Sequence, residues 1–205
     1  MPGDALPTKR PYRMDVRAKA AWWILSTMRC AAFALFRSRP FHEVTLQAIA
    51  EASGVTLQTV LRRFGSKERL FTEATKWQIE TVFKRREVTA PGDIPAIVGA
   101  IVASYEDMGD LNWRGVSQED QFPLVKEMFD QARARHRQWV ETCFADWIGR
   151  TRGDERKRRV LLLFAATEFY VWKLYRRDLG MSRALTTARM IDLVNALVRD
   201  FRRQR

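Results

Sequence analysis

The chain has 205 residues, of which 46% are hydrophobic, enough to bury a sizeable core and to exclude a disordered chain. Its formal net charge of +12 indicates a polyanionic partner, with nucleic acid preferred to an anionic membrane. The N-terminal sequence has no apolar signal segment, and no stretch approaches about 18 uncharged apolar residues. We therefore expect a cytoplasmic protein that has no membrane span.

Signatures of catalysis and of metal binding are missing from the sequence. The motifs of serine hydrolases, zinc hydrolases, P-loop proteins and dinucleotide-binding enzymes do not occur. Cys30 and Cys143 occupy apolar surroundings at no metal-ligand spacing, which predicts buried thiols in a reducing compartment. We expect a protein that is not an enzyme and that needs no metal or other cofactor.

The first predicted elements are an arm and a helix. Residues 1–13 are basic and rich in proline, which predicts a disordered arm. From Asp15 to Ser38 the apolar residues recur at helical spacing, and Pro40 cannot continue the helix. The buried face of this helix is expected to carry Leu25, Met28, Ala32, Leu35 and Phe36.

Two short helices are predicted next, at about 45–52 and 56–64. Thr45 and Thr56 are their N-cap candidates, because a threonine hydroxyl accepts hydrogen bonds from the first amides of a helix. Gly54 lies in the turn between them, where left-handed backbone is expected. Two short helices joined by a tight glycine turn predict a helix-turn-helix over residues 45–64, followed by a longer helix from Ser66 to about Val88.

The second short helix is expected to present its outer face to a partner. Ala50 is small where the two helices would cross, and a small core is expected from Ile49, Val60 and Phe64. At about 13 Å the second helix is short enough to lie in a DNA major groove. The side chains expected on its outer face are Leu57, Gln58, Leu61 and Arg62.

Several segments between residues 25 and 75 resemble the N-terminal domain of TetR-type regulators. These segments are Ala31-Ala32, Leu35-Phe36, Val44-Thr45, Ile49-Ala50, Ser53–Thr56, Thr59–Phe64 and Ser66–Leu70. The resemblance implies an all-α protein with two domains. An N-terminal three-helix helix-turn-helix DNA-binding domain would span residues 14–75, and a helical-bundle ligand-binding and dimerisation domain would span residues 76–205.

The resemblance also implies contacts to the DNA backbone. Thr45 and Thr56 would bind phosphate through their hydroxyl groups and the helix N-terminal amides. Thr59 would bind phosphate or bond back to its own helix, and Lys67 would anchor a phosphate at the start of the next helix. In the arm region, Lys9, Arg10, Arg13 and Arg17 would reach a minor groove or the backbone.

Base edges would be contacted from the second short helix by Leu57, Gln58, Leu61 and Arg62. Gln58 suits adenine and Arg62 suits guanine. The family usually has a phosphate-binding tyrosine at the position of Leu61, so Leu61 would meet a thymine methyl group instead. Arg62 and Arg63 would supply the lost phosphate contact.

The remaining chain predicts a bundle of longer helices, at about 94–108, 123–150, 155–178 and 184–203, with a loop or a short broken helix over 110–122. No segment shows the two-residue alternation of a sheet. The resemblance implies that the last two helices pair with those of a second subunit, and the nearly all-round apolar sequence 160–174 favours this. The expected homodimer interface contains Leu161, Phe164, Ala165, Phe169, Trp172, Met190, Leu193, Val194, Leu197 and Phe201.

A small-molecule effector is expected among the middle helices, enclosed by aromatic and methionine side chains. The candidate contacts are Tyr105, Met108, Trp113, Phe122, Met128, Phe129, Trp139, Phe144 and Glu168. Glu168 has apolar helical neighbours, so it either pairs with a basic group such as Arg189, the favoured interpretation, or meets the ligand. His136 lies among arginines and is expected on a solvated face.

Together with the resemblance, these patterns predict a repressor that binds operator double-stranded DNA as a homodimer and leaves it when a small-molecule effector binds the bundle. A regulator with no natural small-molecule ligand is an intermediate possibility. The alternative is a basic helical protein that binds nucleic acid or anionic membrane without sequence preference. An excess of unrelated duplex DNA separates the two hypotheses, because only a sequence-specific regulator keeps its site under that competition.

Overall fold

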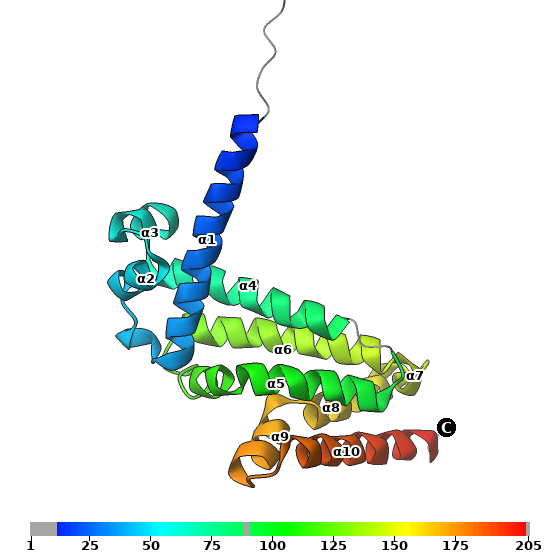
Figure 1. The fold of residues 1–205 in the computed structure, drawn as a ribbon. Helices are drawn as coiled ribbons and strands as arrows, with labels where there is room; N and C mark the ends of the chain where they lie inside the picture. Colours follow the sequence, from blue (N-terminus) through cyan, green and yellow to red (C-terminus); the bar gives the residue numbers. More distant parts are fainter. Residues whose placement is uncertain (1–11, 88–90, 204–205) are drawn as a thin grey trace, which may run out of the picture. The chain divides into compact units, whose positions relative to one another are not determined.

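The computed structural model describes residues 12–87 and 91–203, and Figure 1 shows the helices that these residues form. The described residues make up two compact units, which divide between Thr75 and Lys76. The described residues contain helices and no strand, which confirms the predicted all-α class. None of the helices in these two ranges combines the length and the apolar character that a membrane crossing needs. The arm residues Lys9 and Arg10 lie outside the described residues, as do the side chains of Arg13 and Arg17.

The first unit contains α1 (Tyr12–Ser38), the 3₁₀ turn η1 (Phe41–Glu43), α2 (Leu46–Ser53), α3 (Leu57–Phe64) and the start of α4 (Lys67–Glu87). The stripe predicted on α1 is confirmed: Met28, Ala32 and Phe36 are buried, and Leu25 and Leu35 are half-buried. The buried residues that complete this core are Val44, Ile49, Ala50, Val60, Phe64, Leu70, Phe71 and Ala74.

One cysteine prediction is wrong. Cys30 is exposed, because it lies on α1 outside the stripe that Met28, Ala32 and Phe36 form. Cys143 is buried as predicted, and burial raises the pKa of its thiol to about 11. Cys143 is therefore a protonated core residue at neutral pH.

The second unit contains the rest of α4 and a bundle. Its helices are α5 (Ile94–Val116), α6 (Pro123–Cys143), α7 (Ala145–Ile148), α8 (Gly153–Ala166), α9 (Phe169–Lys173), the π-helical turn η2 (Leu174–Asp178) and α10 (Arg183–Arg203). α5 packs against α6, α9 and α10, and α8 packs against α6 and α10. The buried side chains of this core include Ile97, Ile101, Val140, Phe144, Leu163, Trp172, Met190 and Val194.

Helix α5 continues beyond the predicted end at residue 108 to Val116, so the first part of the segment 110–122, predicted as a loop or a short broken helix, belongs to α5. Gly109 does not end the helix but lets another side chain approach it, because a Cβ at this position would clash with the Trp172 indole. That indole donates a hydrogen bond from Nε1 to Glu106 Oε1 at 3.1 Å. Gly115 plays the same role for the ring of Phe129.

Helix α6 ends at Cys143, earlier than the predicted end at residue 150. The Gly92 amide, from the segment before α5, donates to the Cys143 carbonyl at 3.2 Å. Phe144 then leaves helical geometry at φ −107° and ψ 22°, and the chain resumes as the short α7. A contact from a distant segment thus divides a continuous helical pattern.

The penultimate helix, predicted as one element over 155–178, is broken at Thr167 and Glu168. The Tyr105 hydroxyl donates to the Thr167 carbonyl at 3.0 Å, and the Thr167 side chain donates back to the Leu163 carbonyl at 2.8 Å. Glu168 then adopts extended backbone at ψ 154° before α9 begins. The break places the Glu168 carboxylate at a helix junction.

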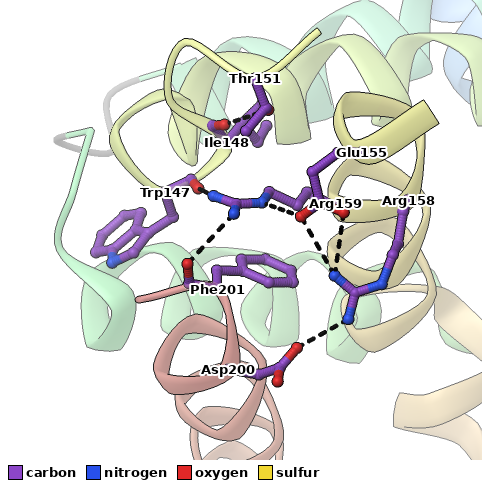
Figure 2. A network of polar contacts seen from close by, with 8 residues as sticks. All are labelled: Trp147, Ile148, Thr151, Glu155, Arg158, Arg159, Asp200 and Phe201. Atoms are coloured by element: carbon purple, nitrogen blue, oxygen red, sulfur yellow. Dashed lines mark hydrogen bonds and ion pairs between the residues drawn. The ribbon is translucent and has the colours of Figure 1, made fainter. Parts of the chain in front are cut away.

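A buried arginine joins three elements of the second unit (Figure 2). The Arg159 side chain, on α8, is 2% exposed and donates to the Glu155 carboxylate at 2.6 Å. Its other nitrogens donate to the backbone carbonyls of Trp147 at 2.9 Å and Phe201 at 3.2 Å. Since these carbonyls belong to α7 and to the C-terminal part of α10, Arg159 fastens both to α8.

Candidate DNA-binding and ligand-binding sites

The two short helices begin at the predicted caps. Thr45 Oγ1 accepts from the Ala48 amide at 3.1 Å, and Thr56 Oγ1 accepts from the Thr59 amide at 3.2 Å. Between the helices Gly54 has φ 68°, the left-handed conformation that ends α2 and turns the chain into α3. Its amide bonds to the last carbonyls of α2, so the turn is closed by main-chain groups.

The inner faces of α2 and α3 form the predicted small core. Ile49, Ala50, Val60 and Phe64 are almost fully buried. Ala50 has no side-chain atom beyond Cβ, so the helices can approach closely where they meet. This packing fixes which side chains α3 turns outward.

The outward face of α3 is basic and polar. Gln58, Arg62 and Arg63 are exposed, and Leu61 is 42% exposed. Leu57 and Thr59 are half-buried, and the Thr59 hydroxyl lies 2.9 Å from that of Thr56. The exposed side chains combine a hydrogen-bonding amide, two guanidinium groups and one apolar group.

Lys67 has contacts that the sequence did not predict. Its Nζ donates to the Phe41 carbonyl at 3.0 Å and to the His42 carbonyl at 3.5 Å, and it lies 4.5 Å from the centre of the Phe41 ring. Lys67 therefore joins the start of α4 to η1. The phosphate contact expected of Lys67 stays a prediction.

Two tryptophans of α1 enlarge the exposed aromatic surface of this unit. Trp22 and Trp23 are 67% and 65% exposed. Trp22 lines a surface hollow of about 480 Å³ together with Thr59, Arg62 and Arg63 of α3. The hollow extends the polar face of α3 to α1.

Residues 30–74, which hold the turn and both short helices, match the family model described as "Bacterial regulatory proteins, tetR family". The helix-turn-helix of the N-terminal unit is thus similar to the tetR family of bacterial regulatory proteins. The match ends within α4, one residue before the end of the first compact unit at Thr75. No curated protein sequence matches the chain.

Solved structures extend the likeness from residues 30–74 to most of the chain's length. A structure described as a transcriptional regulator from Pseudomonas aeruginosa PAO1 is 16% identical, with TM-score 0.67, over 88% of this chain and 93% of its own. A regulator from Rhodococcus sp. RHA1 is 12% identical, with TM-score 0.67, over 86% and 96%. One described as a TetR-family regulator from Mesorhizobium loti MAFF303099 is 18% identical, with TM-score 0.57, over 87% and 94%. At these identities the likeness establishes the fold.

The second unit holds a cavity of about 90 Å³. It is lined from α4 by Ile79, Val82, Phe83 and Arg86, from α5 by Ser104, Tyr105, Met108, Asn112 and Val116, from α6 by Phe129, Ala132, Arg133 and His136, and at the α8–α9 junction and on α9 by Glu168, Phe169 and Tyr170. Apolar side chains make up much of the wall, and charged or polar groups cluster around Arg86, His136 and Glu168.

Four of the nine candidate ligand contacts line this cavity, namely Tyr105, Met108, Phe129 and Glu168. Trp139 lines a separate hollow of about 290 Å³ with Cys143. Phe144 is fully buried in the core, and Trp113 is exposed with the Lys173 ammonium 4.0 Å from its ring centre. Phe122 and Met128 are half-buried and are not among the cavity residues.

Sequence patterns predicted the wrong environment for one cavity residue, His136, and did not identify another, Arg86. His136 is 4% exposed, not on a solvated face, and its ring stacks on Trp139 with centroids 5.5 Å apart. Arg86 is 6% exposed, although it ends a basic run, Lys84–Arg86, that is typical of a helix surface. A serine and a tyrosine in the apolar pattern of α5, Ser104 and Tyr105, are a sequence signal for a polar site near Arg86 and His136.

The favoured prediction, that Glu168 pairs with a basic group such as Arg189, is wrong within this chain. Arg189 pairs with Asp192 at 2.8 Å, because both lie one turn apart on the exposed side of α10. Glu168 instead lines the cavity, with Oε2 buried and without a hydrogen-bond partner among the described residues. Burial raises the pKa of this carboxyl group above its ordinary value.

Five residues expected at a dimer interface are buried in the core of this chain, because the break after Thr167 turns α9 inward and α10 packs on α5. These are Phe169, Trp172, Met190, Val194 and Phe201. Leu161 and Ala165 are exposed on α8, and Phe164, Leu193 and Leu197 are half-buried. Of the ten residues expected at the interface, only the exposed and half-buried five on α8 and α10 have side-chain surface that a second subunit could contact.

Stability is expected to depend on His136 at mildly acidic pH. Burial, aided by the charge of Arg86, lowers the pKa of His136 from 6.5 to about 3. The unfolded chain therefore binds a proton below pH 6.5 that the folded chain excludes, and stability falls as the pH falls. Between pH 6.5 and 5.5 the His136 contribution should lower the free energy of unfolding by about 1 kcal/mol.

The variant His136→Gln isolates this contribution. Glutamine does not titrate, so urea unfolding of the variant across this range should show a shallower pH dependence than the parent chain. Glu168 remains in both proteins and cancels in the comparison. Parallel pH profiles for the two proteins would show that His136 is already protonated, or solvated, in the folded state.

Proposed function

We propose that this chain is a sequence-specific DNA-binding transcriptional regulator whose α3 enters the major groove of an operator. The observation that carries the proposal is the exposed set Gln58, Leu61, Arg62 and Arg63 on a short helix held by the Thr56 cap and the Gly54 turn. A glutamine amide pairs with adenine, an arginine with guanine, and an apolar group with the thymine methyl. The TetR-family match of residues 30–74 supports the same function.

We propose further that the regulator is a homodimeric repressor and that a small molecule in the bundle cavity releases it from DNA. Two recognition helices related by two-fold symmetry contact successive major grooves, so the operator should contain two inverted half-sites. α4 supports a link between ligand and DNA affinity, because it begins directly after α3 and carries Arg86, a cavity residue, near its other end.

Selection of bound duplexes from a random pool tests the DNA-binding proposal. We expect enrichment of one inverted repeat, with binding that survives a large excess of unrelated duplex. Recovery of duplexes without a shared sequence, or loss of binding to the competitor, would instead identify a generic polyanion binder.

The dimer interface is expected to use the exposed side of α8. Replacing Leu161, which is 51% exposed, by glutamate should raise the dimer dissociation constant at least about tenfold, because the new charge would lose water on association. Sedimentation velocity over a concentration series measures this constant. Leu179→Glu is the matched control, since Leu179 is equally exposed but follows η2. An unchanged dimer in Leu161→Glu would exclude α8 from the interface.

A further inference from the structure

The bundle cavity collects buried polar atoms that lack partners. Within the described residues, Arg86 Nε, His136 Nδ1 and Glu168 Oε2 are buried and have no hydrogen-bond partner, and all three side chains line the cavity. Buried polar groups in proteins are nearly always hydrogen-bonded, so three unpartnered atoms around one cavity indicate a site built for a ligand.

The donor and acceptor roles of these atoms follow from their neighbours. We assign the single hydrogen of Thr167 Oγ1 to the Leu163 carbonyl, its shortest contact at 2.8 Å, and His136 Nε2, 3.1 Å from the same oxygen, is then the donor. His136 Nδ1 is then an acceptor without a hydrogen. Arg86 Nε carries a hydrogen and can only donate.

The Arg86 guanidinium is already held without a carboxylate. Its Nη2 donates to Ser104 Oγ at 2.6 Å, and its carbon lies 4.9 Å, 5.2 Å and 6.0 Å from the ring centres of Phe83, Tyr105 and Trp139. Aromatic faces stabilise a cation electrostatically. The position of the guanidinium is therefore fixed before a ligand arrives, and Nε is the donor left for it.

Water alone fits this cavity poorly. A buried water needs about 2–4 polar partners, so the three unpartnered atoms satisfy about one water molecule. The cavity of about 90 Å³ has room for more, and the rest of its wall includes apolar side chains such as Val82, Met108, Val116 and Phe129. An occupant with one polar end and an apolar body matches both parts of the wall.

We propose that the cavity binds a small uncharged amphiphile whose head group both donates and accepts hydrogen bonds, a primary amide being the best match. The carbonyl oxygen accepts from Arg86 Nε, and the two N–H groups donate to His136 Nδ1 and Glu168 Oε2. A carboxylate head has no hydrogen for the His136 acceptor. The role of such an amphiphile as the effector rests on the proposed function. Its binding to the cavity is measured without DNA.

Burial of Glu168 strengthens the preference for an uncharged head. Burial raises the pKa of its carboxyl group, so Glu168 is protonated more readily than an exposed glutamate and can then donate as well as accept. An amide or a hydroxyl group complements either form. An anion complements only the protonated form, and a cation only the ionised form.

Three isosteric probes of the full-length chain test the proposal: isobutyramide, isobutyrate and methyl isopropyl ketone. They share the same apolar body and differ in the group that stands in place of the amide nitrogen. By titration calorimetry at pH 7 we expect isobutyramide to bind at least about tenfold more tightly than the other two, since each lacks the donors. Tighter isobutyrate binding, equal ketone binding, or no isobutyramide binding would each overturn the proposal.

Two further measurements keep the test independent of folding defects. Binding should change the ¹⁵N chemical shift of His136 Nδ1, because that atom gains a hydrogen-bond donor; an unchanged shift with bound isobutyramide would place the probe elsewhere. Glu168→Gln should weaken isobutyramide binding about tenfold, whereas Glu141→Gln, which alters a carboxylate paired with Arg156 outside the cavity, should not. Failure of these probes leaves the operator selection unaffected, so the two proposals fail separately.

Discussion

Replacing Arg159 by methionine is expected to lower the free energy of unfolding of the second unit by about 2–4 kcal/mol. The methionine fills a similar volume but cannot donate to the carbonyls of Trp147 and Phe201, which Arg159 bonds at 2.9 Å and 3.2 Å. Each buried carbonyl left without a donor costs about 1–3 kcal/mol. The loss of Glu155 as an ion-pair partner adds little, because Glu155 is 36% exposed.

Amide hydrogen exchange in α8 and α10 measures this change where it occurs. The neighbouring variant Arg158→Met is the matched control, since Arg158 pairs with Glu155 and Asp200 at the surface and should leave protection nearly unchanged (Figure 2). Equal protection of α10 in both variants would mean that water satisfies the two carbonyls and that Arg159 does not fasten the helix end.

The helix-turn-helix could be predicted from sequence because its determinants are local. Thr45, Thr56 and Gly54 act within three or four residues of themselves, through a cap hydrogen bond or a left-handed turn. Ala50 and Val60 then follow from the spacing of two short helices. Local signals of this kind need no knowledge of distant contacts.

The bundle could be predicted as a set of helices but not in its boundaries. Helix α6 ends where the Gly92 amide donates a hydrogen bond to the Cys143 carbonyl. Helix α8 ends where the Tyr105 hydroxyl donates to the Thr167 carbonyl. Gly92 precedes Cys143 by 51 residues and Tyr105 precedes Thr167 by 62 residues, so the helical periodicity of α6 and α8 gives no sign of these contacts. The same Tyr105 contact creates the Glu168 junction and hence part of the cavity.

The polar half of the cavity could not be predicted from sequence, again because it depends on contacts between distant segments. Arg86 and His136 each lie in basic sequence that is typical of a solvated helix face. Their burial depends on how α4, α5 and α6 pack, which places Ser104 beside Arg86 and Thr167 beside His136. Glu168 alone could be identified from sequence, because a carboxylate among apolar helical neighbours requires a partner.

Loss of both proposed base contacts should have the largest effect on operator binding. In the double variant Gln58→Ala, Arg62→Ala, the preference for the selected operator over random duplex should fall by about 2–6 kcal/mol, because each bidentate contact to a base contributes about 1–3 kcal/mol of discrimination. Both side chains are exposed, so helix α3 and its core should stay intact. Affinity for random duplex should fall much less, since only one positive charge is removed.

Competition binding with the selected operator and a scrambled duplex, at two salt concentrations, measures both affinities. Arg199→Ala removes one exposed positive charge from α10 and serves as the charge-matched control, which should keep full discrimination. If the double variant weakens both duplexes by the same factor, Gln58 and Arg62 contact phosphate rather than bases. Discrimination must then come from elsewhere on the first unit, and the hollow shared by Trp22 and Arg63 becomes the surface to test.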